Sequence, residues 1–140
     1  MEKWIVFALI SMLFAGMTSV IAKLGLDGIS GELGLSIRTI FVFGFVLIFA
    51  MLSVPVAQLG QLTRQNIAWL GLSGVTTTIS WIFYYKAIKL GEVSVVALID
   101  KGSFVVAVIL AWLILKEQIT ARTVVGGLLI VAGLVVVSRR

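Results

Sequence analysis

The sequence predicts an all-α integral membrane protein, and three features of the chain lead to this class. Five apolar stretches, each long enough to cross a bilayer, fill nearly all of its 140 residues. Hydrophobic residues make up 61% of the chain and charged residues 12%, about half the charged share of a soluble domain. There is only one proline. A soluble bundle is excluded because soluble helices average about 11–12 residues, and so short a chain cannot hide five helices that are apolar all round.

The five predicted transmembrane helices are joined by loops too short to hold a soluble domain, so residues 1–140 form one domain. The spans are Trp4–Leu26, Leu33–Val54, Asn66–Ile88, Val93–Leu115 and Ala121–Ser138. Even the shortest covers roughly 27 Å at ~1.5 Å per residue, against a hydrocarbon core about 30 Å thick. An odd number of spans places the two termini on opposite sides of the membrane.

The ends of the spans carry residues that belong at a membrane interface. The first span follows Lys3, but it far exceeds the about 7–15 apolar residues of a secretory signal, so we expect it to stay in the membrane. The connecting loops contain glycine, proline or charge, as helical hairpins do where they turn at the interface. They are Asp27–Glu32, Pro55–Gln65, Lys89–Glu92 and Lys116–Thr120.

The basic residues are divided almost equally between the two sides of the membrane, so they set only a weak preference for one orientation. Those near helix ends on the amino-terminal side are Lys3, Arg64, Lys116 and Arg122. Those on the opposite side are Lys23, Lys86, Lys89, Arg139 and Arg140, with Arg38 one turn inside the second span. Topology follows an excess of Lys and Arg on the cytoplasmic face. Two explanations stay open: the chain inserts in both orientations, or a small bias places the carboxy-terminal side in the cytoplasm.

Several partners and activities are excluded by composition. The net charge is +5, but the cations are scattered singly rather than gathered on a face, which argues against nucleic acid. The chain has no cysteine and no histidine, so disulfides, thiolate sites and most transition-metal sites lack ligands. The P-loop, the HExxH zinc motif and a serine elbow with a histidine partner are all missing. We expect no metal, no cofactor and no enzymatic activity.

Asp100 and Lys101 are the most unusual residues inside a span. If the fourth helix begins near Val93, Asp100 lies about 10 Å along the axis, too deep for a short carboxylate to reach the interface. An ionised side chain there costs several kcal/mol unless it is paired or wetted, so a deep acid is a functional-site hypothesis. The alternative is that the pair only neutralises neighbouring charges and fixes helix packing, or that Lys101 snorkels outward.

Three further cations lie in the same half of the membrane as Asp100, namely Lys23, Arg38 and Lys86. Together these groups would line a water-filled vestibule that attracts an anionic or zwitterionic solute. The alternative is that each cation snorkels to lipid phosphates.

The third span offers rings and hydroxyls together. Trp81, Tyr84 and Tyr85 lie near its end, where aromatic residues form either the interfacial belt or the wall of a substrate site. A site is favoured by residues that recur every four positions on one helical face. They are Trp69, Ser73, Thr77 and Trp81.

Small residues predict where helices approach closely. In the fourth span one stripe contains Asp100, Ser103, Ala107 and Ala111. The last span contains Gly126, Gly127 and Gly133 and carries no charge between Arg122 and Arg139. Because this span has nothing to add to a polar pathway, we expect its glycine face to associate with another helix, within one chain or between two.

The second half of the chain carries a recognisable pattern: the Leu115–Thr120 turn (LKEQIT), the glycine-rich helix that follows it, and the hairpin formed by Trp81–Leu90 and Glu92–Ala97. With this pattern the chain resembles the EamA domain, the unit of the drug/metabolite transporter superfamily. The similarity covers the whole chain and is most specific over Trp81–Val137. Where many relatives have a proline in the fourth helix, this chain has Asp100-Lys101-Gly102, which resembles the Asp-Lys pair of short single-domain relatives.

The resemblance implies a secondary transporter or exporter of small metabolites or drug-like compounds in the plasma membrane of a prokaryote. Most members have two such domains in inverted tandem, which makes ten helices. Two copies of this chain inserted in opposite directions would rebuild that arrangement and work by alternating access. The implied partners are the bilayer, a small solute, and a second copy or a similar chain. The alternative is a non-transporting helper subunit of a heteromeric transporter or a lipid-modifying system.

The weak charge bias makes orientation easy to change. Adding two lysines on one side of the chain is expected to fix it in a single direction, because the excess of cations then exceeds the natural bias. Reporter fusions at Arg140 measure the location of that terminus. Dual insertion is ruled out if the wild-type chain has one location only and added charge cannot change it.

Overall fold

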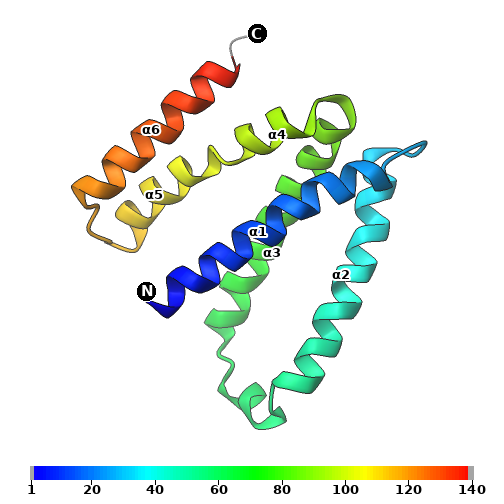
Figure 1. Cartoon of the computed structure of the whole chain (residues 1–140). Helices are drawn as coiled ribbons and strands as arrows, with labels where there is room; N and C mark the ends of the chain where they lie inside the picture. The colour runs from blue at the N-terminus through cyan, green and yellow to red at the C-terminus, as the bar shows by residue number, and fades with distance from the viewer. Residues whose placement is uncertain (1, 139–140) are drawn as a thin grey trace. The chain divides into compact units, whose positions relative to one another are not determined.

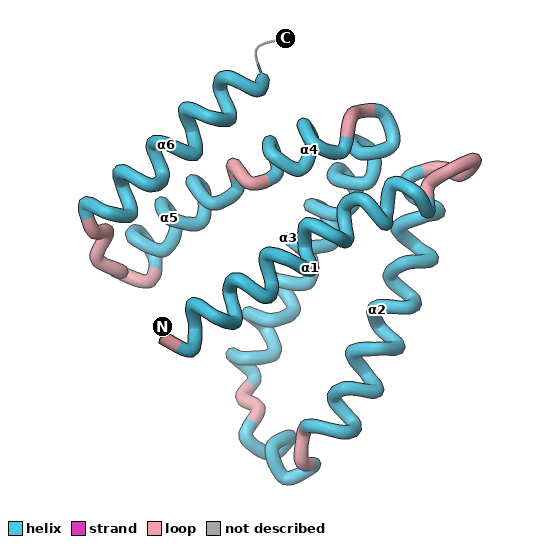
Figure 2. The backbone as a smooth tube through the Cα atoms, viewed as in Figure 1, coloured by secondary structure: helices cyan, strands magenta, loops and turns pink. Residues whose placement is uncertain are grey.

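The computed structural model describes residues 2–138, and every regular element in that range is helical (Figures 1 and 2). The elements are α1 (Lys3–Gly25), α2 (Gly31–Ser53), a 3-10 turn η1 (Val56–Gln61), α3 (Arg64–Leu90), α4 (Val93–Asp100), α5 (Ser103–Ile114) and α6 (Ala121–Ser138). The all-helical class expected from the sequence is confirmed. Arg139 and Arg140, which entered the charge comparison, lie outside the described residues.

Four segments are long and apolar enough to cross a membrane, judged by length and composition. They are α1, α2, α3 and the stretch Val93–Ile114 that contains both α4 and α5. The remaining apolar helix, at Ala121–Val137, is shorter. The fifth crossing therefore stays a prediction, although this segment is one regular helix.

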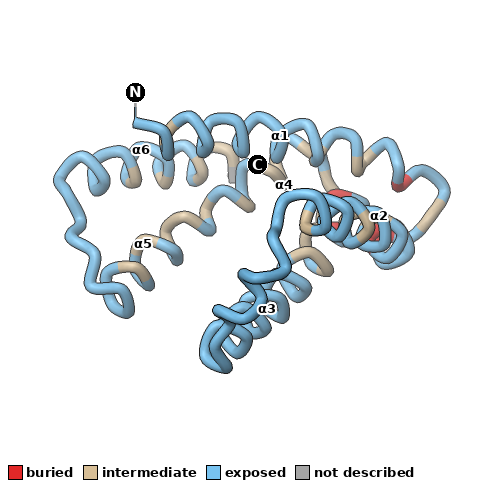
Figure 3. Tube along the Cα trace, turned by 90° about the horizontal axis from the view of Figure 1, so that it is seen from below, coloured by how far each residue is buried: buried red, intermediate tan, exposed pale blue. Residues whose placement is uncertain are grey.

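Most side chains on these helices are exposed, including large apolar ones (Figure 3). Among the described residues the buried apolar side chains are Leu26, Leu35, Tyr85 and Ile88. Such apolar surfaces are stable only against lipid or other protein, because removing them from water is strongly favourable. Contacts divide the chain into two compact units, Ile21–Leu90 and Met1–Val20 with Gly91–Arg140.

In the unit Ile21–Leu90, helices α2 and α3 pack where Gly31 meets the backbone of Tyr85. A Cβ on Gly31 would lie 2.9 Å from the Tyr85 carbonyl oxygen, so only glycine fits this approach. The first residues of both helices are capped by hydroxyls. The Leu33 N–H donates to Ser30 Oγ (3.2 Å), and the Asn66 N–H donates to Thr63 Oγ1 (3.1 Å).

In the other unit, α6 packs against the segment formed by α4 and α5. A Cβ on Gly127 would lie 3.2 Å from the Phe104 ring, and a Cβ on Gly102 would lie 3.3 Å from Leu134 Cδ1. The turn before α6 begins with Lys116 in the left-handed region (φ 59°). It ends at Thr120, whose Oγ1 accepts a hydrogen bond from the Thr123 N–H (3.2 Å).

The fourth span is interrupted, whereas the sequence predicted one continuous helix over Val93–Leu115. Helix α4 ends at Asp100 and α5 begins at Ser103, and Figure 2 shows the break between them. Across the break, backbone hydrogen bonds join residues three apart, as in a 3-10 helix: Lys101 N–H to Leu98 O (3.1 Å) and Gly102 N–H to Ile99 O (2.9 Å). Glycine is a poor helix former, and at position 102 it also allows the contact with Leu134.

This difference matters for the predicted stripe of small residues. A 3-10 turn advances by about 120° per residue rather than 100°, so the helical register after the break is shifted. Besides α4, which packs against α6, Gly102 and Phe104 lie close to α6, opposite Leu134 and Gly127 respectively. Ser103 and Ala107 are exposed, and Ala111 is half-buried.

The close approach at Gly31 gives a direct test of α2–α3 packing. Gly31→Ala is expected to lower the free energy of unfolding by about 1–3 kcal/mol, because its methyl group must push backbone apart. Gly44→Ala, in the same helix, has nothing within 4 Å of the new Cβ and is expected to be neutral or slightly stabilising. Unfolding in detergent, followed by circular dichroism, compares the two. Equal stabilities would contradict this packing.

Candidate functional site

The candidate site is formed where the first turns of α2 meet the last turns of α3. Arg38 lies roughly 10 Å along α2 from its first residue, at ~1.5 Å per residue. Its guanidinium carbon is 4.4 Å from the centre of the Trp81 ring and 5.8 Å from the centre of the Tyr85 ring. Trp81 and Tyr85 are four residues apart and therefore lie on one face of α3, which is why both reach the same side chain.

Arg38 keeps its charge in this position because a guanidinium does not lose its proton in proteins. The two rings attract the cation through their negative faces, by about 2 kcal/mol or more when water is excluded. The rings do not replace hydrogen-bond acceptors. Nη1 of Arg38 and the hydroxyl of Tyr85 are both buried, and neither has a hydrogen-bond partner among the described residues.

A carboxylate at the start of α2 pairs with a different cation. Glu32 Oε1 lies 3.2 Å from Lys86 Nζ, and both side chains are about half-exposed. The pair joins the first turn of α2, where the helix dipole favours an acid, to the last turns of α3, where it favours a base. This carboxylate pairs with Lys86, and Arg38 forms no ion pair in the described part of the chain.

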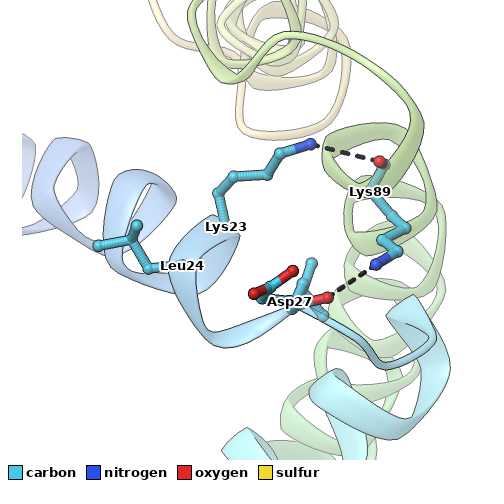
Figure 4. Close-up of a pocket in the computed structure, with 5 residues that line it drawn as sticks. Lys23, Leu24, Asp27 and Lys89 are labelled. Atoms are coloured by element: carbon cyan, nitrogen blue, oxygen red, sulfur yellow. Dashed lines mark hydrogen bonds between the residues drawn. The ribbon is translucent and has the colours of Figure 1, made fainter.

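Two lysines connect the ends of α1 and α3 reciprocally. Lys23 Nζ donates to the carbonyl oxygens of Ile88 and of Lys89 (3.3 Å to Lys89). Lys89 Nζ in turn donates to the carbonyl oxygen of Leu26 (2.7 Å), and Figure 4 shows the two side chains reaching across in opposite directions. The last carbonyls of a helix lack intrahelical partners and form the negative end of its dipole. Lys23 of α1 therefore supplies hydrogen bonds to carbonyls at the end of α3, and Lys89 of α3 supplies one to the carbonyl just after α1.

A shallow pocket of about 300 Å³ opens beside these lysines (Figure 4). Its walls are Lys23, Leu24, Leu26, Asp27 and Lys89. A second, open groove of about 640 Å³ lies between α2 and α3. It is mostly apolar and is lined by Glu32, Leu35, Ser36, Thr39, Ile40, Phe43, Thr78 and Ile82. The three hydroxyls in this groove donate to carbonyls of their own helices, so their lone pairs are what a solute would meet.

The structure brings part of the predicted site together. Lys23, Arg38 and Trp81 lie in one unit, at the end where α1, α2 and α3 meet. Tyr84 packs edge-on against Tyr85, with ring centres 6.5 Å apart. Ser73 and Thr77 are exposed two turns and one turn before Trp81, and the Thr77 hydroxyl donates to the Ser73 carbonyl (2.8 Å).

Other residues were missed or interpreted differently from the sequence. Tyr85 is only 4% exposed, because it packs inside the unit formed by Ile21–Leu90. Its position four residues after Trp81 was the available signal. Glu32 and Lys89 were assigned to loops, and nothing in the sequence indicated that they contact α3 and α1 respectively.

Asp100 and Lys101 lie in the other unit, at the break between α4 and α5. Their charged atoms are 4.0 Å apart, and the side chains are 40% and 58% exposed. Such a neighbouring pair is weakly coupled and leaves the carboxylate accessible. The grouping of Asp100 with the cations of α1 and α2 stays a prediction.

The predicted packing glycines differ in their surroundings. Gly127 contacts Phe104 of the same chain. At Gly126 and Gly133, an added Cβ would have nothing within 4 Å, so this face of α6 is open in the described part of the chain. Ala111 lines a small cavity of about 100 Å³ near the turn between α5 and α6.

Long apolar helices, exposed apolar side chains and charges gathered at helix ends define a multi-pass integral membrane protein. The family profile described as "EamA-like transporter family" matches residues 2–139, and the chain belongs to this family. A curated relative from Sinorhizobium sp., named "Uncharacterized transporter in cobO 3'region", is 34% identical over 138 residues. The match covers 94% of this chain and 94% of the relative. No solved structure matches. The family resemblance seen in the sequence is thereby confirmed.

The reciprocal lysines predict a stability effect at this end of the unit. Lys23→Gln and Lys89→Gln are each expected to lower the free energy of unfolding by about 0.3–1 kcal/mol, because charge at a helix carboxyl end is lost. Lys3→Gln, at the opposite end of α1, serves as the control. Chemical unfolding in detergent measures all three. A control variant as unstable as the other two would contradict a specific role for Lys23 and Lys89.

Proposed function

We propose that this protein is a secondary transporter or exporter of small metabolites or drug-like compounds, and that it works by alternating access in a dimer. The observation that carries the proposal is that one EamA-like domain spans the whole chain, and that a relative of similar length is named a transporter. The chain moves a solute and does not transform it. Its residues include none of the nucleotide, zinc or serine motifs that would drive other chemistry.

Two chains, inserted antiparallel, complete the pathway in this proposal. Helix α6 is then the fifth crossing of each chain, and the five spans form one half of an inverted repeat. The near balance of cations on the two sides supports insertion in both directions. The open positions at Gly126 and Gly133 are seven residues apart, on one face of α6, and suit close packing against the second copy. The membrane is the plasma membrane of a prokaryote.

Within each chain, the solute pathway uses polar and aromatic side chains of the first four spans. They are Asp100, Lys101, Lys23, Arg38, Trp81, Tyr84, Ser73 and Thr77. The break in the helix beside Asp100 supports this role, because non-helical backbone at membrane depth is tolerated where it lines a cavity. Discontinuous helices are also where many transporters place their binding sites.

The test is transport by the purified protein alone. Small metabolites are first screened for those that raise the melting temperature of the purified protein. Each stabilising compound is then loaded into liposomes that contain the protein, and its exchange across the bilayer is followed. Uptake or efflux by this single chain supports the proposal. A chain that moves none of the stabilising compounds alone, and moves them only with a second, similar chain, fits the helper-subunit alternative.

Asp100 is the residue whose role this assay decides. If Asp100 binds solute or a coupling proton, Asp100→Asn is expected to abolish transport in a protein that remains folded, and Asp100→Glu to keep part of it. Normal transport by Asp100→Asn, with unchanged pH dependence, would remove Asp100 from the mechanism. The rings and hydroxyls of α3 would then be the better candidates.

A further inference from the structure

We propose that Arg38 and Tyr85 form a recognition site for an oxyanion, the carboxylate or phosphate group of a ligand with an apolar body. The inference deepens the proposed function by giving the class of ligand, and in that sense rests on it. The site itself is defined by contacts within the single unit Ile21–Leu90.

The first argument is the unmet hydrogen-bonding capacity of two neighbouring side chains. Nη1 of Arg38 and the hydroxyl of Tyr85 are buried without a partner among the described residues, and Tyr85 is only 4% exposed. Leaving a buried donor without an acceptor is unfavourable, and more so when the donor is charged. An anionic oxygen is the acceptor that satisfies a guanidinium and a phenol best.

The second argument is charge. Arg38 is permanently cationic, and Glu32, the acidic residue of the same helix, is paired with Lys86. The aromatic faces of Trp81 and Tyr85 hold the cation at 4.4 and 5.8 Å but do not neutralise its charge. A cationic ligand would be repelled here, and a neutral one would leave the charge unbalanced.

The third argument is what lies beside the charge. Trp69, Ser73 and Thr77 precede Trp81 at intervals of four residues and therefore share its face of α3. Both Ser73 and Thr77 are exposed. A ring or short apolar chain can lie along this face while its anionic end reaches Arg38. Both donor atoms are covered in the present structure, so binding requires the guanidinium to lift from the Trp81 ring.

That movement makes Trp81 a natural reporter. In a protein that carries Trp4→Phe, Trp69→Phe and Trp112→Phe, the fluorescence of Trp81 alone is followed in dodecyl maltoside. Benzoate and phenyl phosphate are titrated as soluble anions, with benzyl alcohol and benzylammonium as neutral and cationic probes of the same ring. Short-chain phosphatidylglycerol is titrated separately, since a lipid headgroup offers the same chemistry.

The expected result is a saturable change with at least one anion and none with the neutral or cationic probe. Arg38→Gln should weaken anion binding by about tenfold or more, and Tyr85→Phe by about threefold to tenfold. Arg38→Lys should fall between wild type and Arg38→Gln, because it retains charge but loses the planar fork. Arg64→Gln, at the other end of α3, is the matched control and should bind as the parent does. Binding of soluble anions points to a solute, and binding of phosphatidylglycerol alone points to a lipid headgroup as the source of the oxyanion.

The inference is overturned if benzylammonium or benzyl alcohol binds as well as the anions, or if no anion binds. It is also overturned if anion binding is unchanged in both Arg38→Lys and Tyr85→Phe, two variants that keep most of the packing if Arg38→Gln does not fold. Its failure is distinct from failure of the proposed function. Anion binding that depends on Arg38, in a protein that transports nothing in liposomes, keeps the site and rejects transport. Transport of a cation without any anion binding keeps the proposed transport function and rejects the oxyanion site.

Discussion

The constraint that governs this protein is that a hydrocarbon layer offers no hydrogen bonds to the backbone. Every N–H and C=O within it must be satisfied by the protein itself, so the chain forms helices wherever it is apolar. Only the helix ends need other partners. Three hydroxyls serve the amino ends of α2, α3 and α6, namely those of Ser30, Thr63 and Thr120. Lys23 and Lys89 serve carboxyl ends, and their exchange between helices ties the end of α1 to that of α3.

The same constraint also explains how the backbone is arranged at the break between α4 and α5. Helix α4 stops at Asp100, and hydrogen bonds between residues three apart carry the backbone through Lys101 and Gly102. The backbone groups thus stay largely satisfied while a carboxylate is positioned at the break. A short, tightened stretch of this kind costs less than an open loop, and it changes the direction in which the following side chains point.

The charge of Arg38 is likewise accommodated by the protein itself, through neighbouring side chains. A cation at this depth can reach for water, pair with an acid or rest on aromatic rings. Here it rests on Trp81 and Tyr85, because the glycine at position 31 lets α2 approach the backbone of α3 at Tyr85. Glu32, the carboxylate on the same helix, pairs with Lys86 instead. The charge of Arg38 is therefore held in place without being cancelled by an acid.

By itself, the sequence determined the class of protein, the approximate bounds of the helices and the family, because apolar length and interface residues are local properties that do not depend on partners. It also singled out Arg38, Trp81 and Asp100 as unusual, since polar groups in apolar segments stand out without a structure. Tertiary structure alone decided which of them meet. The pairing of Glu32 with Lys86, the exchange of Lys23 and Lys89, and the burial of Tyr85 all join residues that are distant in the chain. Such contacts depend on how closely two helices approach, and at Gly31 that distance is set by one missing methyl group.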